Sequence, residues 1–381
     1  LSLVHGQWHN GMMPHMIFSK DKKYARDRNM WMSWVARQSP TNIATSGITQ
    51  PPLLAEAVQR VGESLPTTQK IAFFKKMLPV IEAYHLWLYN ERDPHKESLA
   101  LLIHPYETGL DNTPPWVEQQ REHSRPAWIA LIDKLGLENA INFIRRDTRS
   151  VPPEQRMLNV DALMTWDSVL RLRRKHYDIN KILHRSLFAI EDVGFNAIFV
   201  RNNTILQEIA DQARHKIDPE LEERINQSKN ALEELWLDDF GVYFSRDFLT
   251  NQLITIPTVA SLLPLYAGTI DQARAKLLVK ILFTSTAFWL NYPVPSVPKN
   301  SRFFDANRYW QGPTWVNTNW LLIDGLKRMG FQTEAQALIS NTLDMIRTSG
   351  IWEYYNPISG QGLGSPDFSW TAALTLDLLE N

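Results

Sequence analysis

The feature that most constrains the fold is a repeated alternation of amphipathic helical segments and loops rich in Gly, Pro and polar residues. Between Thr67 and Tyr89, apolar residues recur every three or four positions, which is the pattern of one buried helical face. His85 lies on that face and is expected to be a core histidine. Further helices are predicted at about 53–61, 115–135, 159–175, 192–209, 218–236, 259–266, 270–283, 313–329, 333–346 and 365–379. Only a few segments, such as 242–244 and 253–256, resemble strands.

Such a succession of about ten or eleven helices in adjacent pairs, with long loops between them, predicts an all-α toroid of antiparallel hairpins. No fixed sequence period recurs, so a simple solenoid is less expected. No change in composition marks a domain boundary, and we therefore expect a single domain over residues 1–381.

Composition excludes several functional classes. The 381 residues are 44% hydrophobic, and 40 basic and 41 acidic residues leave a formal net charge of -1. No global field therefore favours a nucleic acid or an anionic membrane as partner. The chain has no cysteine, which rules out disulfides and thiolate metal sites. Its start lacks the pattern of a signal peptide, so a cytoplasmic protein is expected.

The loop from His104 to Trp116 concentrates two carboxylates, Glu107 and Asp111, beside aromatic rings. Gly109 and the two prolines before Trp116 favour a loop. Acids beside flat apolar rings are the chemistry that cleavage of a sugar requires. Local helix capping is the competing explanation, because a turn at Asp111 can precede a helix that starts after Thr113.

Three other loops, 6–15, 304–315 and 352–360, also combine Trp with polar groups that can bind hydroxyls. Glu353 is the only acid in the last of them, between Trp352 and Tyr354, where apolar neighbours would perturb its pKa. We predict that Asp111 and Glu353 face each other as a catalytic pair, one protonated and one ionised. An inverting glycosidase needs roughly 6.5–9.5 Å between such groups.

Two other sequence features do not indicate a catalytic or metal site. Asp167 lies in the predicted helix 159–175, where an exposed Asp is the usual outcome. The histidines lack any HExxH-like spacing, so neither a catalytic metal nor a cofactor is expected.

At these loops the sequence resembles the mannosylglycerate hydrolase-like enzymes of glycoside hydrolase family 63, relatives of the processing α-glucosidases and trehalases. The resemblance covers nearly the whole chain and rests on the motifs at 104–112, 309–315, 352–357 and 367–373. It implies an (α/α)6 barrel that hydrolyses a small α-glucoside, α-mannoside or glycosylglycerate with inversion. It also implies that Asp111 is the general acid and Glu353 the general base. The residues implied to line the sugar pocket are Gln7, Trp8, Glu107, Tyr309, Trp310, Gln311 and Trp315.

One departure from the family pattern is that the chain begins after a Trp- and Asp-rich segment found upstream in family members. We therefore expect a toroid that lacks its first hairpin. Uncovered helix faces would then expose Val316, Trp320, Ala372 and Leu376. Two alternative functions remain at this stage: a barrel that binds carbohydrate without cleaving it, and an (α/α)6 sugar epimerase. The sequence does not determine the oligomeric state.

Overall fold

A computed structural model describes residues 2–123, 125–136, 141, 145–184, 186 and 188–380. Contacts along the chain divide it into two compact units. Unit 1 comprises Leu1–Gly109, Trp166–Leu235 and Arg246–Gln252, and unit 2 comprises Leu110–Thr165, Trp236–Ser245 and Leu253–Asn381. The prediction of a single domain stays a prediction, and each unit is described by itself.

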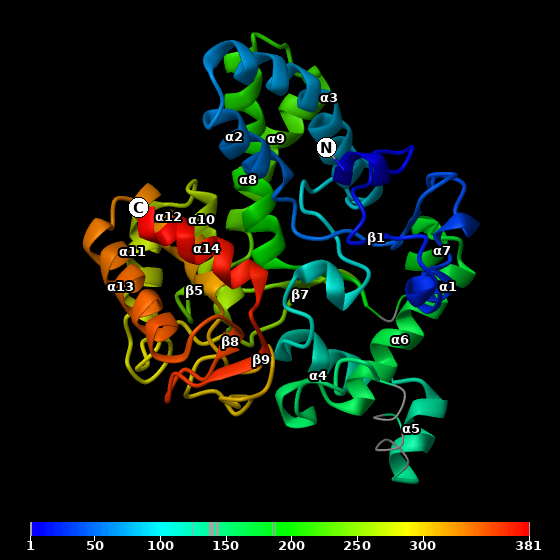
Figure 1. Ribbon diagram of the computed structural model, residues 1–381, viewed down its shortest axis with the longest axis vertical. Coiled ribbons are helices and arrows are strands. Elements are labelled where there is room, and N and C mark those ends of the chain that lie inside the picture. The colour runs from blue at the N-terminus through cyan, green and yellow to red at the C-terminus, as the bar shows by residue number, and fades with distance from the viewer. Residues whose placement is uncertain are drawn as a thin grey trace. The chain divides into compact units, whose positions relative to one another are not determined.

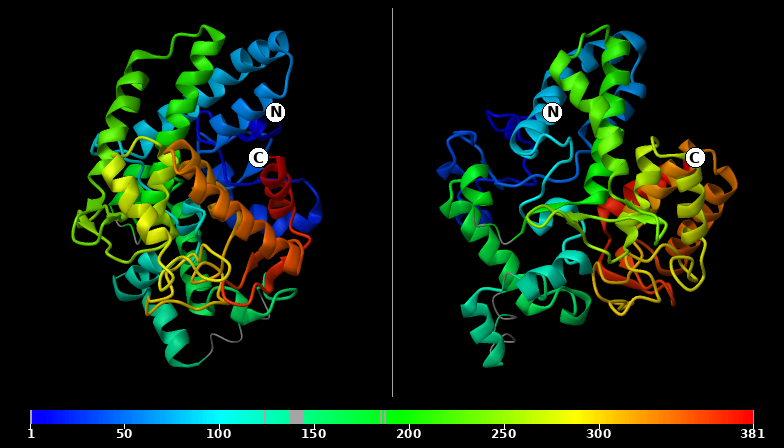
Figure 2. Two further views of the ribbon diagram at one scale, coloured as in Figure 1. Left: turned by 90° about the vertical axis from the view of Figure 1, so that its left-hand side faces the viewer. Right: turned by 180° about the vertical axis from the view of Figure 1, so that it is seen from behind.

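Four helices dominate unit 1 and pack against one another: α2 (Leu54–Glu63), α3 (Thr67–Glu91), α8 (Val193–Ala213) and α9 (Pro219–Glu233). Figure 2 shows the hairpin of α8 and α9 beside α2 and α3. Asp192 caps α8 by accepting from the Phe195 N–H, and Asp218 caps α9 in the same way. Local capping thus fixes where both helices of the hairpin begin.

The rest of unit 1 consists of short elements around a small core. They include α1 (Ala25–Trp31), α7 (Ile179–Leu183) and two antiparallel strand pairs, β1 (Ile17–Phe18) with β2 (Ala44–Thr45) and β3 (Ile190–Glu191) with β6 (Arg246–Asp247). Their buried residues are Trp31, Ile48, Leu101, Ile103, Val169, Leu172, Ile182 and Ala189. Two elements span unit boundaries in the sequence, α6 (Asn159–Arg174) and β7 (Gln252–Leu253).

Unit 2 is built around α12 (Val316–Arg328), which packs on three other helices: α10 (Pro264–Ala267), α13 (Gln332–Ser349) and α14 (Ser369–Glu380) (Figure 1). Gly325 permits the close approach of α10, since a Cβ there would lie 2.6 Å from the Tyr266 nitrogen. The other helices are α4 (Pro114–His123), α5 (Ala127–Lys134) and α11 (Gln272–Leu282). Two hairpins complete the unit, β4 (Trp236–Leu237) with β5 (Val242–Tyr243) and β8 (Trp352–Tyr355) with β9 (Gly362–Pro366).

The helices predicted from sequence are confirmed, with three differences. Residues 259–266 form a 3-10 turn, Val259–Leu262, followed by the single helical turn of α10. Residues 115–135 form two helices, α4 and α5, because Pro126 precedes the second and is extended. The last helix begins at Ser369 and not at 365, because 362–366 pair with Trp352–Tyr355 as strands. The predicted loop at 352–360 therefore begins as strand β8. Alternation within this hairpin is too short to distinguish it from a loop by sequence.

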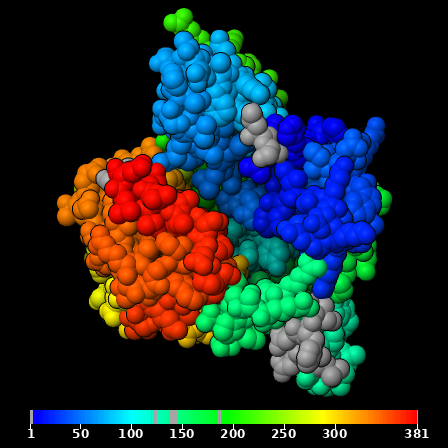
Figure 3. Space-filling view, in the orientation of Figure 1, coloured from blue at the N-terminus to red at the C-terminus, as the bar shows by residue number. Residues whose placement is uncertain are grey.

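The burial of individual side chains agrees with the sequence expectation at some positions and differs from it at others. Val316 and Trp320 are buried, so their predicted exposure is wrong; α12, which carries both, packs on α10, α13 and α14. Leu376 is 65% exposed, as expected. Its helix, α14, is red in Figure 3. Asp167, expected to be exposed, is buried in an ion pair with Arg171. His85 is confirmed as a core histidine, with Nδ1 2.8 Å from the Asn203 side-chain oxygen.

Candidate active site

Asp111 follows the short 3-10 helix Pro105–Thr108 and belongs to unit 2. Its Oδ2 accepts a hydrogen bond of 3.0 Å from the Tyr309 hydroxyl. Asp111 is half-buried, and this burial raises the pKa of its carboxyl group to about 7. The Tyr309 hydrogen bond and the charge of Arg156 lower this pKa, whereas the charge of Glu353 raises it. Asp111 can therefore hold a proton near neutral pH.

Asn112 joins the two predicted loops of this site. Its side-chain oxygen accepts from the Trp310 N–H at 3.0 Å, and its backbone oxygen accepts from the Gln311 side chain at 2.9 Å. The Tyr309 backbone lies in the left-handed region at φ 36, which turns the chain sharply at this residue. These contacts place the Tyr309 hydroxyl opposite Asp111. Capping is not the role of Thr113, because its buried hydroxyl has no partner among the described residues.

Glu353 lies on β8 with its side chain almost fully buried. Both carboxylate oxygens accept from Arg156, Oε1 at 2.8 Å and Oε2 at 2.7 Å, and Oε2 also accepts from the Ser365 N–H at 3.0 Å. Gly364 makes room for this arrangement, since a Cβ at Gly364 would lie 2.6 Å from Oε2 of Glu353. The backbone of Gly364 is also left-handed, at φ +74.

Arg156 connects the two predicted catalytic residues, and sequence reasoning missed it. Its guanidinium carbon lies 5.3 Å from the centre of the Tyr309 ring, whose hydroxyl donates to Asp111. The ion pair of Glu353 is thus part of the cluster that contains Asp111. No local pattern marks Arg156, a single cation after a Pro-rich stretch. The separation of the two carboxyl groups stays a prediction.

The predicted sugar-binding tryptophans form a compact stack. Trp310 and Trp315 are parallel with ring centres 3.8 Å apart, and Tyr354 stacks on Trp315 at 4.6 Å. Trp310 and Trp315 are 2% and 3% exposed, so most of their surface is buried in this stack. The Trp315 indole donates to the backbone oxygen of Tyr309 at 3.1 Å. The stack therefore supports Tyr309 with rigid rings.

Three predicted pocket residues lie in unit 1. Gln7 donates to the backbone oxygens of Gly11 and Val80, and the Trp8 indole donates to Thr45. Glu107 is fully buried and accepts from Arg92 at both oxygens. The backbone N–H groups of Thr49 and Ile103 also donate to the Glu107 carboxylate, one to each oxygen. This arrangement leaves Glu107 no acceptor position for a sugar hydroxyl.

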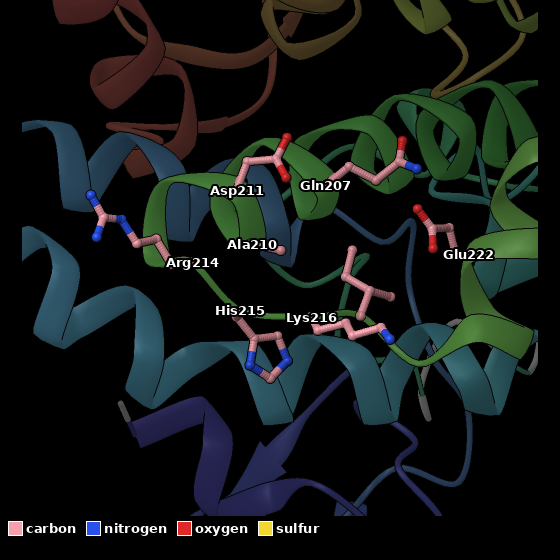
Figure 4. A pocket seen from close by; sticks show the side chains of 8 residues that line it. Gln207, Ala210, Asp211, Arg214, His215, Lys216 and Glu222 are labelled. Atoms are coloured by element: carbon pink, nitrogen blue, oxygen red, sulfur yellow. The ribbon is translucent and has the colours of Figure 1, made fainter.

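A separate hollow of about 600 Å³ in unit 1 lies between the end of α8 and the start of α9 (Figure 4). It is lined by Asp211 and Glu222 and by Arg214 and Lys216, so neither sign of charge dominates. None of the predicted site residues lines it.

Within the described part of the chain, no three His, Cys, Asp or Glu residues form a group that could hold a metal ion. No helix among the described residues is both long and apolar enough to span a membrane.

Comparison with known proteins identifies the family of the chain. Residues 1–371 match the family model of the mannosylglycerate hydrolase MGH1-like glycoside hydrolase domain. The chain belongs to this family. Mannosylglycerate hydrolase of Thermus thermophilus is 37% identical over 98% of this chain and 86% of its own length. Glucosylglycerate hydrolase of Mycolicibacterium hassiacum is 29% identical over 99% of this chain and 85% of its own length.

A crystal structure of a family 63 mannosylglycerate hydrolase from Thermus thermophilus, in complex with Tris and D-glycerate, superposes with a TM-score of 0.86. The two are 34% identical, and the match covers 100% of this chain and 87% of that chain. The protein therefore has the all-α (α/α)6 fold class that its motifs implied, and it is a glycosidase. Family membership favours hydrolysis over the epimerase and over the barrel that only binds sugar.

Proposed function

We propose that the protein hydrolyses a small α-glycoside of glycerate with inversion at the anomeric carbon, with Asp111 as general acid and Glu353 as general base. The observation that carries this proposal is one cluster with two carboxyl groups in different environments. Burial raises the pKa of Asp111 to about 7, whereas Glu353 pairs with Arg156. Two carboxyl groups in unlike environments are the requirement of acid–base glycoside cleavage.

The reaction consists of one displacement. Asp111 gives its proton to the glycosidic oxygen while the bond from that oxygen to the anomeric carbon breaks. A water attacks the anomeric carbon from the opposite face, and Glu353 accepts a proton from that water. The products are the free sugar and glycerate, and the Glu353 proton then returns to solvent while Asp111 takes one up. This displacement requires neither a metal nor an organic cofactor.

The proposed substrate is based on the substrates named for similar proteins. The curated names of the similar proteins specify mannosylglycerate and glucosylglycerate, and one similar structure contains D-glycerate. We therefore propose mannosylglycerate or glucosylglycerate as substrate. A reducing cytoplasmic location remains part of the proposal, on the ground that the sequence contains no cysteine.

The test is an assay of the purified protein with α-mannosylglycerate, α-glucosylglycerate and trehalose. Free glycerate should appear with at least one of the first two, and proton NMR at early times should detect the β-anomer of the released sugar. Asp111→Asn and Glu353→Gln should each reduce turnover about 10²-fold or more, the scale of an acid–base group. Asp305→Asn, which removes a partly exposed carboxylate of the neighbouring loop, is the control. Release of the α-anomer, or near-normal turnover by either catalytic variant, would contradict the assignment.

A further inference from the structure

The ion pair between Arg156 and Glu353 is a two-pronged hydrogen-bonded fork in a nearly dry environment. Both terminal nitrogens of Arg156 donate, at 2.8 and 2.7 Å, and the side chains are only 11% and 8% exposed. Two parallel bonds of this kind fix the plane of the carboxylate as well as its position. A single cation without the fork would fix only the distance.

The contacts of Glu353 with the described residues leave one acceptor position open. A carboxylate offers about four lone-pair positions, two on each oxygen. Arg156 uses one on each oxygen, and the Ser365 N–H uses the second position of Oε2. The remaining position is on Oε1. A water that delivers a proton to Glu353 can therefore approach from one direction only.

Arg156 is itself held by the hairpin that carries Glu353. The preceding residue, Gln155, accepts from the Tyr354 hydroxyl at its backbone oxygen, and its side-chain oxygen accepts from the Gly364 N–H at 2.9 Å. At the other face, the guanidinium lies 5.3 Å from the Tyr309 ring centre, and Tyr309 donates to Asp111. Arg156 thus contacts the supports of both carboxyl groups.

We infer that Arg156 is a positioning residue for the hydrolysis, which orients Glu353 so that its one free acceptor position receives the attacking water. This inference rests on the proposed function of Asp111 and Glu353. Arg156 itself touches no reacting atom and acts through Glu353. Lysine cannot replace it fully, because an ammonium group is a point charge without the planar fork.

The test compares Arg156→Lys, Arg156→Ala and the control Arg347→Ala in the purified protein, with the glycosylglycerate that the wild type cleaves best. Arg347 lies in an exposed ion pair with Asp344 on α13. Loss of orientation should reduce the kcat of Arg156→Ala about 10²-fold, since a misplacement of about 1 Å has this effect, while KM changes little. The kcat of Arg156→Lys should lie between that of Arg156→Ala and that of the wild type. Non-denaturing guanidinium chloride should raise the kcat of Arg156→Ala only.

A folded Arg156→Lys with wild-type kcat would overturn the inference, because the charge alone would then suffice. A rise in KM with unchanged kcat in Arg156→Ala would also overturn it, by indicating substrate binding. If Arg156→Ala does not fold, the Arg156→Lys result decides. Glu353→Gln is measured in parallel. If Glu353→Gln stays active, the proposed function fails; if it is inactive while the Arg156 variants are normal, only this inference fails.

Discussion

Replacing Tyr309 by Phe should move the alkaline limb of the pH–rate profile to higher pH. The Tyr309 hydroxyl donates to Asp111 at 3.0 Å and lowers the pKa of that carboxyl group, which burial raises to about 7. A hydrogen bond to a charged group contributes about 1.5–3 kcal/mol, and one pKa unit corresponds to about 1.4 kcal/mol. Loss of the hydroxyl should therefore raise the pKa of Asp111 by about one to two units.

The direction in which the alkaline limb moves follows from the role of Asp111 as a proton donor. Activity is expected below the pKa of Asp111 and lost above it, so kcat/KM of the wild type should decline above about pH 7. In Tyr309→Phe the decline should begin about one to two pH units higher. The phenyl ring preserves the contact with the guanidinium of Arg156.

The assay is kcat/KM against pH for the wild type, Tyr309→Phe and the control Tyr355→Phe. The Tyr355 hydroxyl contacts only the backbone of Gly350 and Trp352 among the described residues, so its loss should leave the limb in place. An unmoved limb in Tyr309→Phe, or a limb shifted to lower pH, would refute the assignment of Asp111 as the acid.

Three further predictions concern stability and the support of Glu353. Asp111→Asn should be more stable than the wild type at pH 8, on the order of 2–4 kcal/mol, and this gain should vanish toward pH 4 in urea unfolding curves. This pH dependence follows from the raised pKa of Asp111. The folded form holds the proton between the ordinary pKa of 3.8 and about 7, so wild-type stability falls as pH rises through this window. Gly364→Ala should abolish most turnover, because the added Cβ displaces Glu353. The control is Gly330→Ala, which should lose stability only, because Gly330 has a φ of +88 and open space around it. Equal turnover of the two variants would contradict the steric argument. Glu107→Ala should destabilise the fold by about 3–5 kcal/mol by leaving Arg92 buried without its partner, as measured by thermal unfolding, and a near-normal melting curve would show that the pair is not structural.

Sequence patterns were sufficient wherever the deciding interactions are local. A helix cap joins residues two or three positions apart, and the helices predicted to begin at 192 and 218 are capped there by Asp192 and Asp218. Apolar periodicity likewise marked α3, with His85 on its buried face. The two candidate acids, Asp111 and Glu353, are likewise indicated by the residues of their own loops and motifs.

Tertiary structure alone decided what those acids contact. Arg156 binds Glu353 across 197 positions of sequence, and Tyr309 binds Asp111 across 198. No spacing rule connects residues so far apart, because their approach depends on how every intervening element packs. Glu107 illustrates the same point: its motif implied a sugar contact, but its place in the fold gives both oxygens to Arg92 and to backbone N–H groups. Residue type and local spacing therefore determined which groups can carry the chemistry, and packing determined which of them keep a free acceptor or a proton to give.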